Sequence, residues 1–548
     1  MIKNRIKTTL IHLGLVLTAA ILFAASFPNV LFKNGLPFFA WFAYIPVLVL
    51  IRKNNLPSCA GWGAIYGCIA YALFNYWLGA FHPLAGTIVY TIYLVYLAVV
   101  FLLLKFADSA FPKYSYIVQW VIWLAYEYLR TKGFLGYSYG ITGYSQWRII
   151  PLIQIASVTG VWGVSALVAF PSFWLAQALK DWQTDSGLKG IGNAVVSFFR
   201  SQKISAVCWA LALAASLVFG IVQSKDFSSS PSAQIALIQH NSDPWEATKT
   251  PFQWQITEAY RSDLTTLIRL SDEAIASEPA PQLVVWPETA FIPRIFWHLT
   301  YRDDQDSWIL VRDLLVYLSS KDVPFLIGND DGRRDPAINP DPGEKHRVDY
   351  NAALYYENGF NTGYRKLRLV PFTEHFPYRK QFPFIYNWLK KADTHFWEMG
   401  EVETVFNGPG FNFSSPICFE DTFGYLSRNF VRRGADVLVN LSNDAWSGSL
   451  PAQYQHLSMA VFRAVENFRP MVRSTSSGQT CAVDPNGRVT VMASPFEETW
   501  LNVSIPLVKG DTLYTRYGDF IGFFFTLIAV ILLLFAAVWC TMKKLKRG

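Results

Sequence analysis

Charged residues are scarce in this sequence of 548 residues. Asp, Glu, Lys and Arg together make up 16% of the chain, and hydrophobic residues make up 52%. An ordinary globular domain carries about 25% charged residues. The shortage of charge indicates long segments that face lipid, and the length excludes a single small domain.

Cysteine is also rare, and its distribution excludes a disulfide framework. The six cysteines are Cys59, Cys68, Cys208, Cys418, Cys481 and Cys540. Four lie in apolar runs, where packing is their ordinary role. Cys418 and Cys481 lie in a polar segment, where one disulfide between them is an open alternative. No group of Cys and His has the spacing of a zinc site, so we expect neither a metal nor a cofactor.

The net charge of +7 is not spread over a folded face. Lys and Arg instead form short clusters beside apolar runs. Nucleic-acid binding would favour a basic face on a folded domain. The pattern therefore favours a membrane protein and excludes nucleic acid as a partner.

Long apolar segments mark the membrane-spanning part. A helix needs about 20 apolar residues to cross a bilayer. We predict eight such spans, at 9–27, 36–51, 57–79, 84–104, 114–130, 151–179, 204–222 and 520–540. The predicted organisation is a membrane domain of seven helices (1–225), a polar domain (226–515), and a C-terminal span with a basic tail (516–548).

Lys and Arg predict the orientation of these spans, because cytoplasmic loops are enriched in them. The basic side carries Lys3, Arg5, Lys7, Arg52, Lys53, Lys105, Lys113, Lys180, Lys189, Arg200, Lys203, Lys543, Lys544, Lys546 and Arg547. Both termini are therefore predicted to be cytoplasmic, with the polar domain outside. A cleaved signal peptide at 1–27 is the alternative, which the spans directly after it disfavour.

The polar domain alternates apolar strands with amphipathic helices. "AQIALIQHN", "VPFLIGND" (323–330) and "GADVLVNLSND" (434–444) have the composition of buried strands. Residues 255–275 and 453–470 have helical periodicity. Such alternation predicts a layered α/β domain.

Three reactive side chains follow apolar strands in this domain. Glu288 ends "VVWPE", Lys366 lies in "YRKLRLVPFTE", and Cys418 lies in "SPICFE". A thiol has a pKa of about 8.5, so it needs a base or a nearby cation to react at neutral pH. Glu288 can serve as the base. Lys366 can serve as the cation that offsets the carboxylates beside Cys418 and stabilises an oxyanion.

Taken singly, each of these residues has an ordinary explanation. A Glu after "VVWP" is more often a surface turn residue, a Lys in "RKLR" a solvated charge, and a Cys in an apolar strand a packing residue. Their common position at strand ends favours a shared catalytic role.

These three motifs resemble the Glu-Lys-Cys triad of the nitrilase, or carbon–nitrogen hydrolase, superfamily. The membrane part is similar to that of the bacterial apolipoprotein N-acyltransferase family over 123–167. So are "NLSNDAW" (440–446) and "HLSMAVFRAVENFRPMVRSTSSGQTCAVDPNGRV" (456–489). The resemblance implies a membrane bundle of eight helices joined to a nitrilase-like α-β-β-α sandwich.

The family resemblance implies acyl transfer in two halves. Cys418 would take an acyl chain from a phospholipid such as phosphatidylethanolamine, forming a thioester. The α-amino group of an S-diacylglyceryl-cysteine, at the N-terminus of a lipoprotein, would then receive the chain as an amide. The expected setting is a bacterial inner membrane with the catalytic domain on the periplasmic side, and the expected state is a monomer.

The resemblance also implies supporting residues. Glu374 and Glu420 would support the geometry and charge of Lys366. Trp245 and Trp446 would lie on lids over the substrate, with core or interfacial packing as the alternative. Phe419 would also contact substrate, although Tyr is frequent at its position in the family.

Three other functions remain open from the sequence. A membrane-tethered amidase would use the same triad with water as acceptor. A non-catalytic lipid-binding protein would not need all three triad residues, and they are all present. A transporter would call for paired broken helices, which the spans lack.

Overall fold

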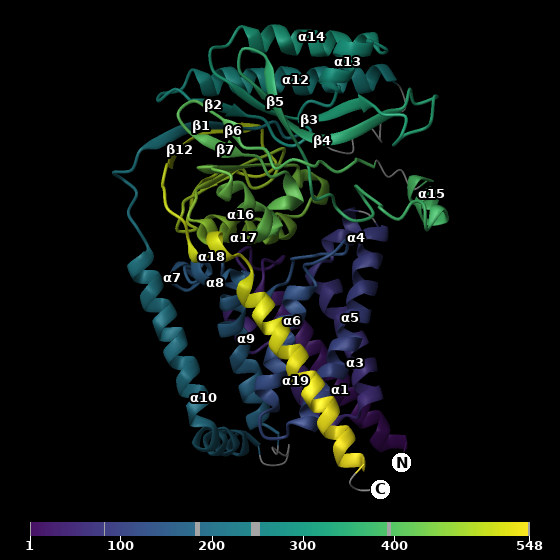
Figure 1. The fold of residues 1–548 in the computed structure, drawn as a ribbon, viewed down its shortest axis with the longest axis vertical. Coiled ribbons are helices and arrows are strands. Elements are labelled where there is room, and N and C mark those ends of the chain that lie inside the picture. The colour runs from purple at the N-terminus through teal and green to yellow at the C-terminus, as the bar shows by residue number, and fades with distance from the viewer. Residues whose placement is uncertain (1, 82, 181–186, 243–252, 392–395, 546–548) are drawn as a thin grey trace. The chain divides into compact units, whose positions relative to one another are not determined.

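The computed structural model describes residues 2–81, 83–180, 187–242, 253–391 and 396–545. The chain divides into two compact units. We call them the helical unit (Met1–Ser224, Leu450–Ser458 and Tyr517–Gly548) and the α/β unit (Lys225–Ser449 and Met459–Arg516). Figure 1 shows the helices of the first and the layered strands of the second.

Long apolar helices dominate the helical unit. Six of the described helices are long and apolar enough to cross a membrane, within α1, α3, α5, α9, α10 and α19. The helices of the unit are α1 (Ile2–Ser26), η1 (Pro37–Trp41), α2 (Ile45–Lys53), α3 (Leu56–Phe74), α4 (Trp77–Phe81), α5 (Pro83–Ala110), α6 (Ser115–Leu129), η2 (Thr142–Gln146), α7 (Ile150–Ile153), α8 (Ala156–Thr159), α9 (Val161–Ala178), α10 (Gly187–Gln223) and α19 (Phe520–Leu545).

The prediction of eight full spans is not confirmed. The segment predicted at 36–51 is two short helices, η1 and α2, because Pro46 lacks the N–H needed to continue a helix. The segment predicted at 114–130 is α6, with 15 residues. The segment predicted at 151–179 is divided by Gly160, whose positive φ of 64° ends one helix before α9 begins.

Successive helices nevertheless run in alternating directions. At one end of the unit, the end of α2 meets the end of α5, where Asp108 pairs with Arg52 at 3.6 Å and with Lys105 at 3.2 Å. At the other end, Lys132 after α6 pairs with Asp519 before α19 at 2.9 Å. The two chain termini lie at the same end (Figure 1).

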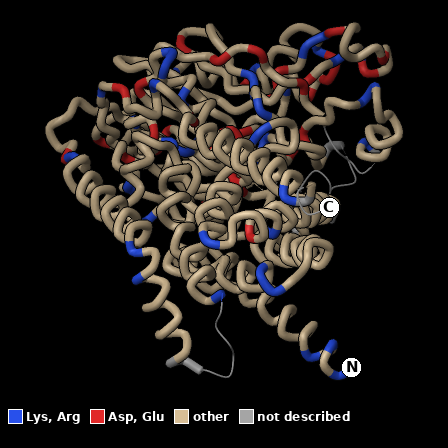
Figure 2. Tube along the Cα trace, turned by 60° about the horizontal axis from the view of Figure 1, so that its bottom comes forward, with Lys and Arg blue, Asp and Glu red and all other residues tan. Residues whose placement is uncertain are grey.

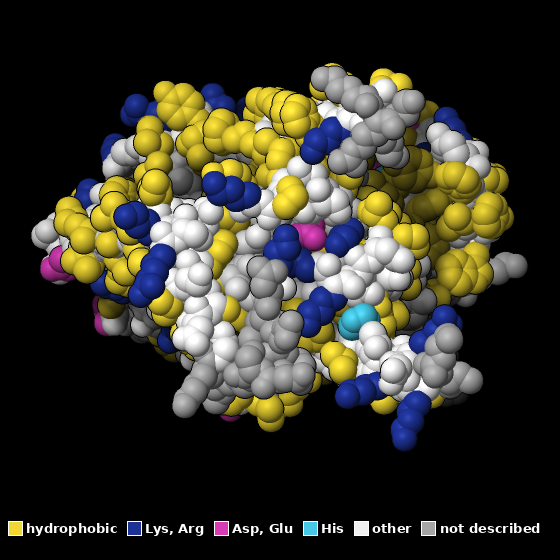
Figure 3. Space-filling model, turned by 90° about the horizontal axis from the view of Figure 1, so that it is seen from below, with side chains coloured by type: hydrophobic (Ala, Val, Ile, Leu, Met, Phe, Trp, Pro, Cys, Tyr) yellow, Lys and Arg dark blue, Asp and Glu magenta, His cyan; other side chains and the backbone are white. Residues whose placement is uncertain are grey.

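Positive charge gathers where the termini lie. The free end of the N-terminal helix is basic, and uncharged residues fill most of the helical unit (Figure 2). Viewed from that end, Lys and Arg side chains are numerous and acidic ones few (Figure 3). The arrangement agrees with basic clusters at one set of helix ends.

Helices α3 and α5 pack closely because small residues line their contact. Gly63 and Gly67 are four residues apart, the spacing that lets two membrane helices approach. A Cβ at Gly67 would lie 2.2 Å from the carbonyl oxygen of Tyr93, and one at Gly63 would lie 2.4 Å from that of Leu97. The backbone of α5 therefore occupies the space where side chains would stand.

The α3–α5 contact generates the first prediction. Gly67→Leu should force the helices apart and lower the thermal unfolding temperature in detergent by several degrees, the size expected of overpacking by about 1–3 kcal/mol. Gly61→Leu is the matched control, because a Cβ there meets nothing within 4 Å. Equal unfolding temperatures for the two variants would contradict the packing argument.

Two six-stranded sheets form the centre of the α/β unit. The first has the order β12-β1-β2-β3-β4-β5, and the second β11-β10-β9-β8-β7-β6. The strands of the first are β1 (Ser232–Gln239), β2 (Leu283–Val285), β3 (Phe325–Arg334), β4 (Arg347–Tyr356), β5 (Phe360–Arg365) and β12 (Thr499–Pro506). Those of the second are β6 (Phe406–Asn407), β7 (Asn412–Ser414), β8 (Val437–Ser442), β9 (Met471–Thr475), β10 (Cys481–Val483) and β11 (Val489–Met492).

Helices cover the outer faces of the sheets (Figure 1). On the first sheet, apolar residues of α12 and α14 pack with strand residues such as Val284 and Ile327 in one buried cluster. The helices of the unit are α12 (Gln253–Ile275), α13 (Ile295–Tyr301), α14 (Gln305–Ser319), α15 (Pro383–Lys391), η4 (Cys418–Thr422), α16 (Gly424–Arg432), η5 (Asp444–Ser447), α17 (Leu450–Asn467) and α18 (Leu513–Tyr517). This layering is the predicted α-β-β-α sandwich.

Candidate active site

Three strand ends bring Glu288, Lys366 and Cys418 together. Glu288 lies three residues after β2, and Lys366 directly follows β5, both in the first sheet. Cys418 follows β7 of the second sheet and begins the turn η4. Since side chains from both sheets meet here, the site lies between the layers of the sandwich.

Glu288 is held by contacts to both carboxylate oxygens. Its Oε1 accepts from Lys366 Nζ at 3.2 Å and from Asn351 Nδ2 at 2.8 Å. Its Oε2 accepts from the backbone N–H of Asn443 at 2.9 Å. The side chain is buried, so these donors fix its orientation and compensate its burial.

Lys366 is fully buried between two carboxylates. Its Nζ lies 3.2 Å from Glu288 Oε1 and 2.9 Å from Glu374 Oε1. Burial by itself lowers the pKa of an ammonium, but Glu288 and Glu374 outweigh burial and hold the pKa of Lys366 well above its ordinary value. The side chain is therefore a permanent positive charge. Glu374 is itself held by the N–H of Val370, 2.9 Å from its Oε2.

Cys418 sits on a strained turn. Its φ is 49°, a left-handed conformation that non-glycine residues rarely adopt. Burial, and next Glu288, raise the pKa of its thiol well above the ordinary value, and Lys366 acts in the opposite direction. Lys366 alone therefore does not make the resting sulfur anionic. The thiol is therefore protonated at neutral pH, and a thiol in that state needs a base to act as a nucleophile.

The two carboxylates that follow Cys418 are occupied by other partners. Glu420 is fully buried and accepts from Tyr364 Oη at 2.8 Å, from the N–H groups of Leu367 and Arg368 at 2.7 and 2.9 Å, and from the N–H of Ile417 at 2.8 Å. It thereby ties the Cys418 turn to the chain that carries Lys366. Asp421 pairs with Arg473.

The residues predicted to form lids are placed differently from one another. Phe419 is buried and packs edge-on against Phe423 with ring centroids 5.0 Å apart. Trp446 lies in η5, partly exposed. Trp245 lies outside the described residues. The lid roles of all three stay predictions.

Cys418 and Cys481 are separate free thiols, both buried. The disulfide left open by the sequence is therefore not formed in this structure.

Sequence reasoning missed several partners of the triad. Asn351 and Asn443 hold Glu288, Tyr364 holds Glu420, and Arg473 holds Asp421. The sequence around an Asn in a strand, or around an Arg in an apolar strand, does not predict which residue that side chain will contact. Register between strands supplies that information, and only the folded structure contains it.

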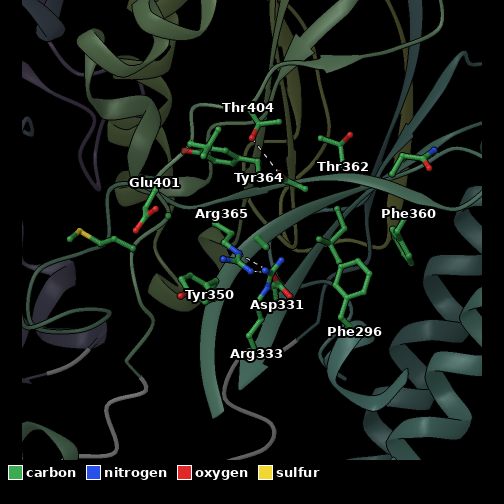
Figure 4. A pocket seen from close by; sticks show the side chains of 17 residues that line it. Phe296, Asp331, Arg333, Tyr350, Phe360, Thr362, Tyr364, Arg365, Glu401 and Thr404 are labelled. Atoms are coloured by element: carbon green, nitrogen blue, oxygen red, sulfur yellow. Dashed lines mark hydrogen bonds and ion pairs between the residues drawn. The ribbon is translucent and has the colours of Figure 1, made fainter. Parts of the chain in front are cut away.

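A pocket of about 450 Å³ lies on the opposite face of the first sheet (Figure 4). Alternate residues of an extended chain point to opposite faces of a sheet. Arg365 therefore lines this pocket, whereas the next residue, Lys366, points to the other side, toward Glu288. Arg365 Nη2 lies 2.6 Å from Asp331 Oδ2, and its guanidinium lies over the Tyr350 ring at 3.9 Å. The triad residues do not line the pocket.

Two known protein families match this chain. Residues 234–513 match the carbon–nitrogen hydrolase family, which covers the α/β unit that holds the triad. Residues 19–174 match the N-terminal domain of apolipoprotein N-acyltransferase.

Relatives of similar length support the same assignment. Apolipoprotein N-acyltransferase 1 of Treponema denticola is 43% identical, with 98% of each chain covered. That of Treponema pallidum is 44% identical, with 97% of each chain covered. The apolipoprotein N-acyltransferase of Geobacter metallireducens is 31% identical, covering 91% of this chain and 90% of its own. The chain therefore belongs to the apolipoprotein N-acyltransferase family, a membrane-bound branch of the carbon–nitrogen hydrolases.

Proposed function

We propose that this acyltransferase N-acylates the N-terminal S-diacylglyceryl-cysteine of lipoproteins through a thioester on Cys418. Family membership supports the overall reaction. The observation that carries the assignment of residues is the Lys366 ammonium, buried between Glu288 and Glu374 beside the strained Cys418 turn.

In the first half-reaction, the thiol of Cys418 gives its proton to Glu288. The sulfur forms a bond to the carbonyl carbon of a phospholipid ester, and the negative charge moves to the carbonyl oxygen. The ester C–O bond then breaks, and the leaving lysophospholipid oxygen takes the proton from Glu288. The products are an acyl thioester and a lysophospholipid.

In the second half-reaction, the α-amino group of the diacylated lipoprotein attacks the thioester. Such an amine has a pKa of about 7.7–8.0, so a neutral fraction exists at pH 7. As the C–N bond forms, Glu288 accepts a proton from the nitrogen. The C–S bond breaks, and the sulfur takes the proton back from Glu288. The resulting amide is stable, which makes the transfer effectively one-way.

Lys366 stabilises the anion that develops in both halves. A fixed cation in a buried site interacts more strongly with developing charge than it would in water. Because Glu288 and Glu374 hold the ammonium in place, it needs no reorganisation during the reaction. Glu420 keeps the Cys418 turn in register with Lys366 through the bonds it accepts from both segments.

The substrates follow from the reaction. The donor is a phospholipid resembling phosphatidylethanolamine, and the acceptor is a diacylated apolipoprotein. Trp446, Phe419 and Trp245 are assigned to the substrate-facing lid. The protein acts as a monomer and uses neither a cofactor nor a metal.

The site works on the periplasmic side of the bacterial inner membrane, with both termini in the cytoplasm. The basic face at the end of the helical unit that holds the termini (Figure 3) supports this orientation, because cytoplasmic ends of spans are enriched in Lys and Arg.

The nucleophile is tested by substitution and mass spectrometry. Wild-type protein incubated with phosphatidylethanolamine should carry an acyl chain on the Cys418 peptide, and the chain should move to an added diacylated lipopeptide. Cys418→Ala should lose both signals, whereas Cys481→Ala, at a second buried thiol, should keep them. Acyl transfer that survives in Cys418→Ala, or turnover of small amides without lipid, would contradict the proposal.

The role of Glu420 predicts a pH dependence. Burial raises the pKa of this carboxyl to about 7, although the hydrogen bonds that it accepts act to lower the pKa. Glu420 is therefore ionised above pH 7 and protonated below it. The added proton would point at groups that are themselves donors, and at least one of these hydrogen bonds would be lost. Formation of the thioester from phospholipid, in which the α-amino group takes no part, should fall as pH drops through 7.

Glu420→Gln places an amide N–H₂ among those donors. It should lower the rate of thioester formation from phospholipid at pH 8 by about 10- to 100-fold, the value of a hydrogen bond to a charged group, and remove the acid limb of that half-reaction. Measurement of initial rates of thioester formation from pH 5.5 to 8.5, without an amine acceptor, checks both effects. An unchanged acid limb in Glu420→Gln would assign that limb to another group.

Orientation is tested by labelling with a membrane-impermeant maleimide. In a background of Cys208→Ser and Cys540→Ser, Glu344→Cys should be labelled in spheroplasts, because Glu344 is exposed on the α/β unit. Lys543→Cys should be labelled only after the membrane is opened. The reverse pattern would place the catalytic unit in the cytoplasm.

A further inference from the structure

A buried arginine lies behind the turn that carries Cys418. Arg473 is in β9 and is fully buried. In the register of the second sheet it is the partner of Asn440 in β8 and of Cys481 in β10. Asn440 donates to the backbone oxygen of Pro416 at 3.1 Å and of Cys418 at 3.5 Å. The arginine is therefore in the strand next to the one that supports the turn.

The guanidinium joins two segments of the site. Its Nη1 pairs with Asp421 Oδ2, three residues after Cys418 in η4. Its Nη2 lies 3.1 Å from Asp444 Oδ2, in the η5 turn that carries Trp446. Ser442 Oγ donates to the other Asp444 oxygen at 3.0 Å. A planar guanidinium suits this geometry, because its two Nη groups are fixed at an angle that an ammonium does not reproduce.

We propose that Arg473 is a positioning residue for the thioester chemistry, which fixes the Cys418 turn against the Trp446 turn and offsets part of the negative charge of Asp421 and Asp444 near the thiol. The inference rests on the proposed role of Cys418 as the nucleophile. It adds an electrostatic function that the triad does not supply.

The charge of Arg473 matters because several carboxylates surround the Cys418 thiol. Burial, and then Glu288, Asp444 and Glu374, raise the pKa of the Cys418 thiol, and Lys366 lowers it. The charge of Arg473 interacts with Asp421, Asp444, Cys481 and Cys418. Without the guanidinium, Asp421 and Asp444 would lose an ion-pair partner near a sulfur that becomes negative in the proposed reaction. Such buried charges are strongly unfavourable unless they are paired.

The test is the pH dependence of iodoacetamide alkylation at Cys418 in the full chain, read by mass spectrometry on the Cys418 peptide. Arg473→Gln should shift the profile upward by about one pH unit, which lowers the alkylation rate about tenfold at a fixed neutral pH. Adding Asp444→Asn should recover at least half of that shift. Arg473→Lys should shift the profile less than Arg473→Gln, because it keeps the charge.

Arg469→Gln is the matched control. Arg469 enters the same strand but donates to the backbone oxygens of Ala435, Phe468 and Gly510. Its variant should lose stability without moving the alkylation profile. A folded Arg473→Gln protein with a wild-type profile would overturn the proposal.

A further variant keeps the proposal testable if Arg473→Gln does not fold. Asp444→Asn alone should shift the profile to lower pH, since it removes a negative charge near the sulfur. A wild-type profile for Asp444→Asn, or a shift to higher pH in that variant, would also overturn the proposal. Alkylation of Cys418 does not require acyl transfer. A Cys418→Ala protein that still transfers acyl chains would therefore overturn the role of Cys418 as nucleophile, independently of the result for Arg473.

Discussion

The buried ammonium of Lys366 is the constraint on which the site depends. A charge removed from water is costly unless opposite charge surrounds it. Glu288 and Glu374 supply that charge at 3.2 and 2.9 Å. Because Glu288 follows β2 and Lys366 follows β5, this pairing ties two parts of the first sheet together. A change that displaces Glu288 leaves Lys366 paired with Glu374 alone and removes this link between the ends of β2 and β5.

The second sheet contributes the sulfur, and buried ionic contacts align it with the first. Glu420 accepts bonds from the Lys366 segment as well as from the Cys418 turn. Arg473 joins that turn to the one at Asp444. Acidic residues beside a thiol raise its pKa by themselves. Glu420 and Asp421 instead make contacts that hold the Cys418 turn in place. The thiol is protonated in this structure, so the proposed reaction must include its deprotonation.

The helical unit illustrates where composition succeeds and where it fails. Hydropathy located the long apolar helices, and the basic clusters agree with their alternating directions. It overestimated the length of the segment at 36–51 because apolar content does not register the break before Pro46. Hydropathy also does not predict that Gly63 and Gly67 allow α5 to approach α3 closely.

The sequence by itself determined the family, because motifs are local properties, and through that family the α-β-β-α sandwich. It also predicted Glu288, Lys366 and Cys418 as the triad. Only the tertiary structure decided which groups hold them: Asn351 and the N–H of Asn443 on Glu288, and Arg473 on Asp421 and Asp444. The reason is physical. Strand register and the packing of two sheets set these contacts between residues far apart in the chain, and local pattern carries no record of them.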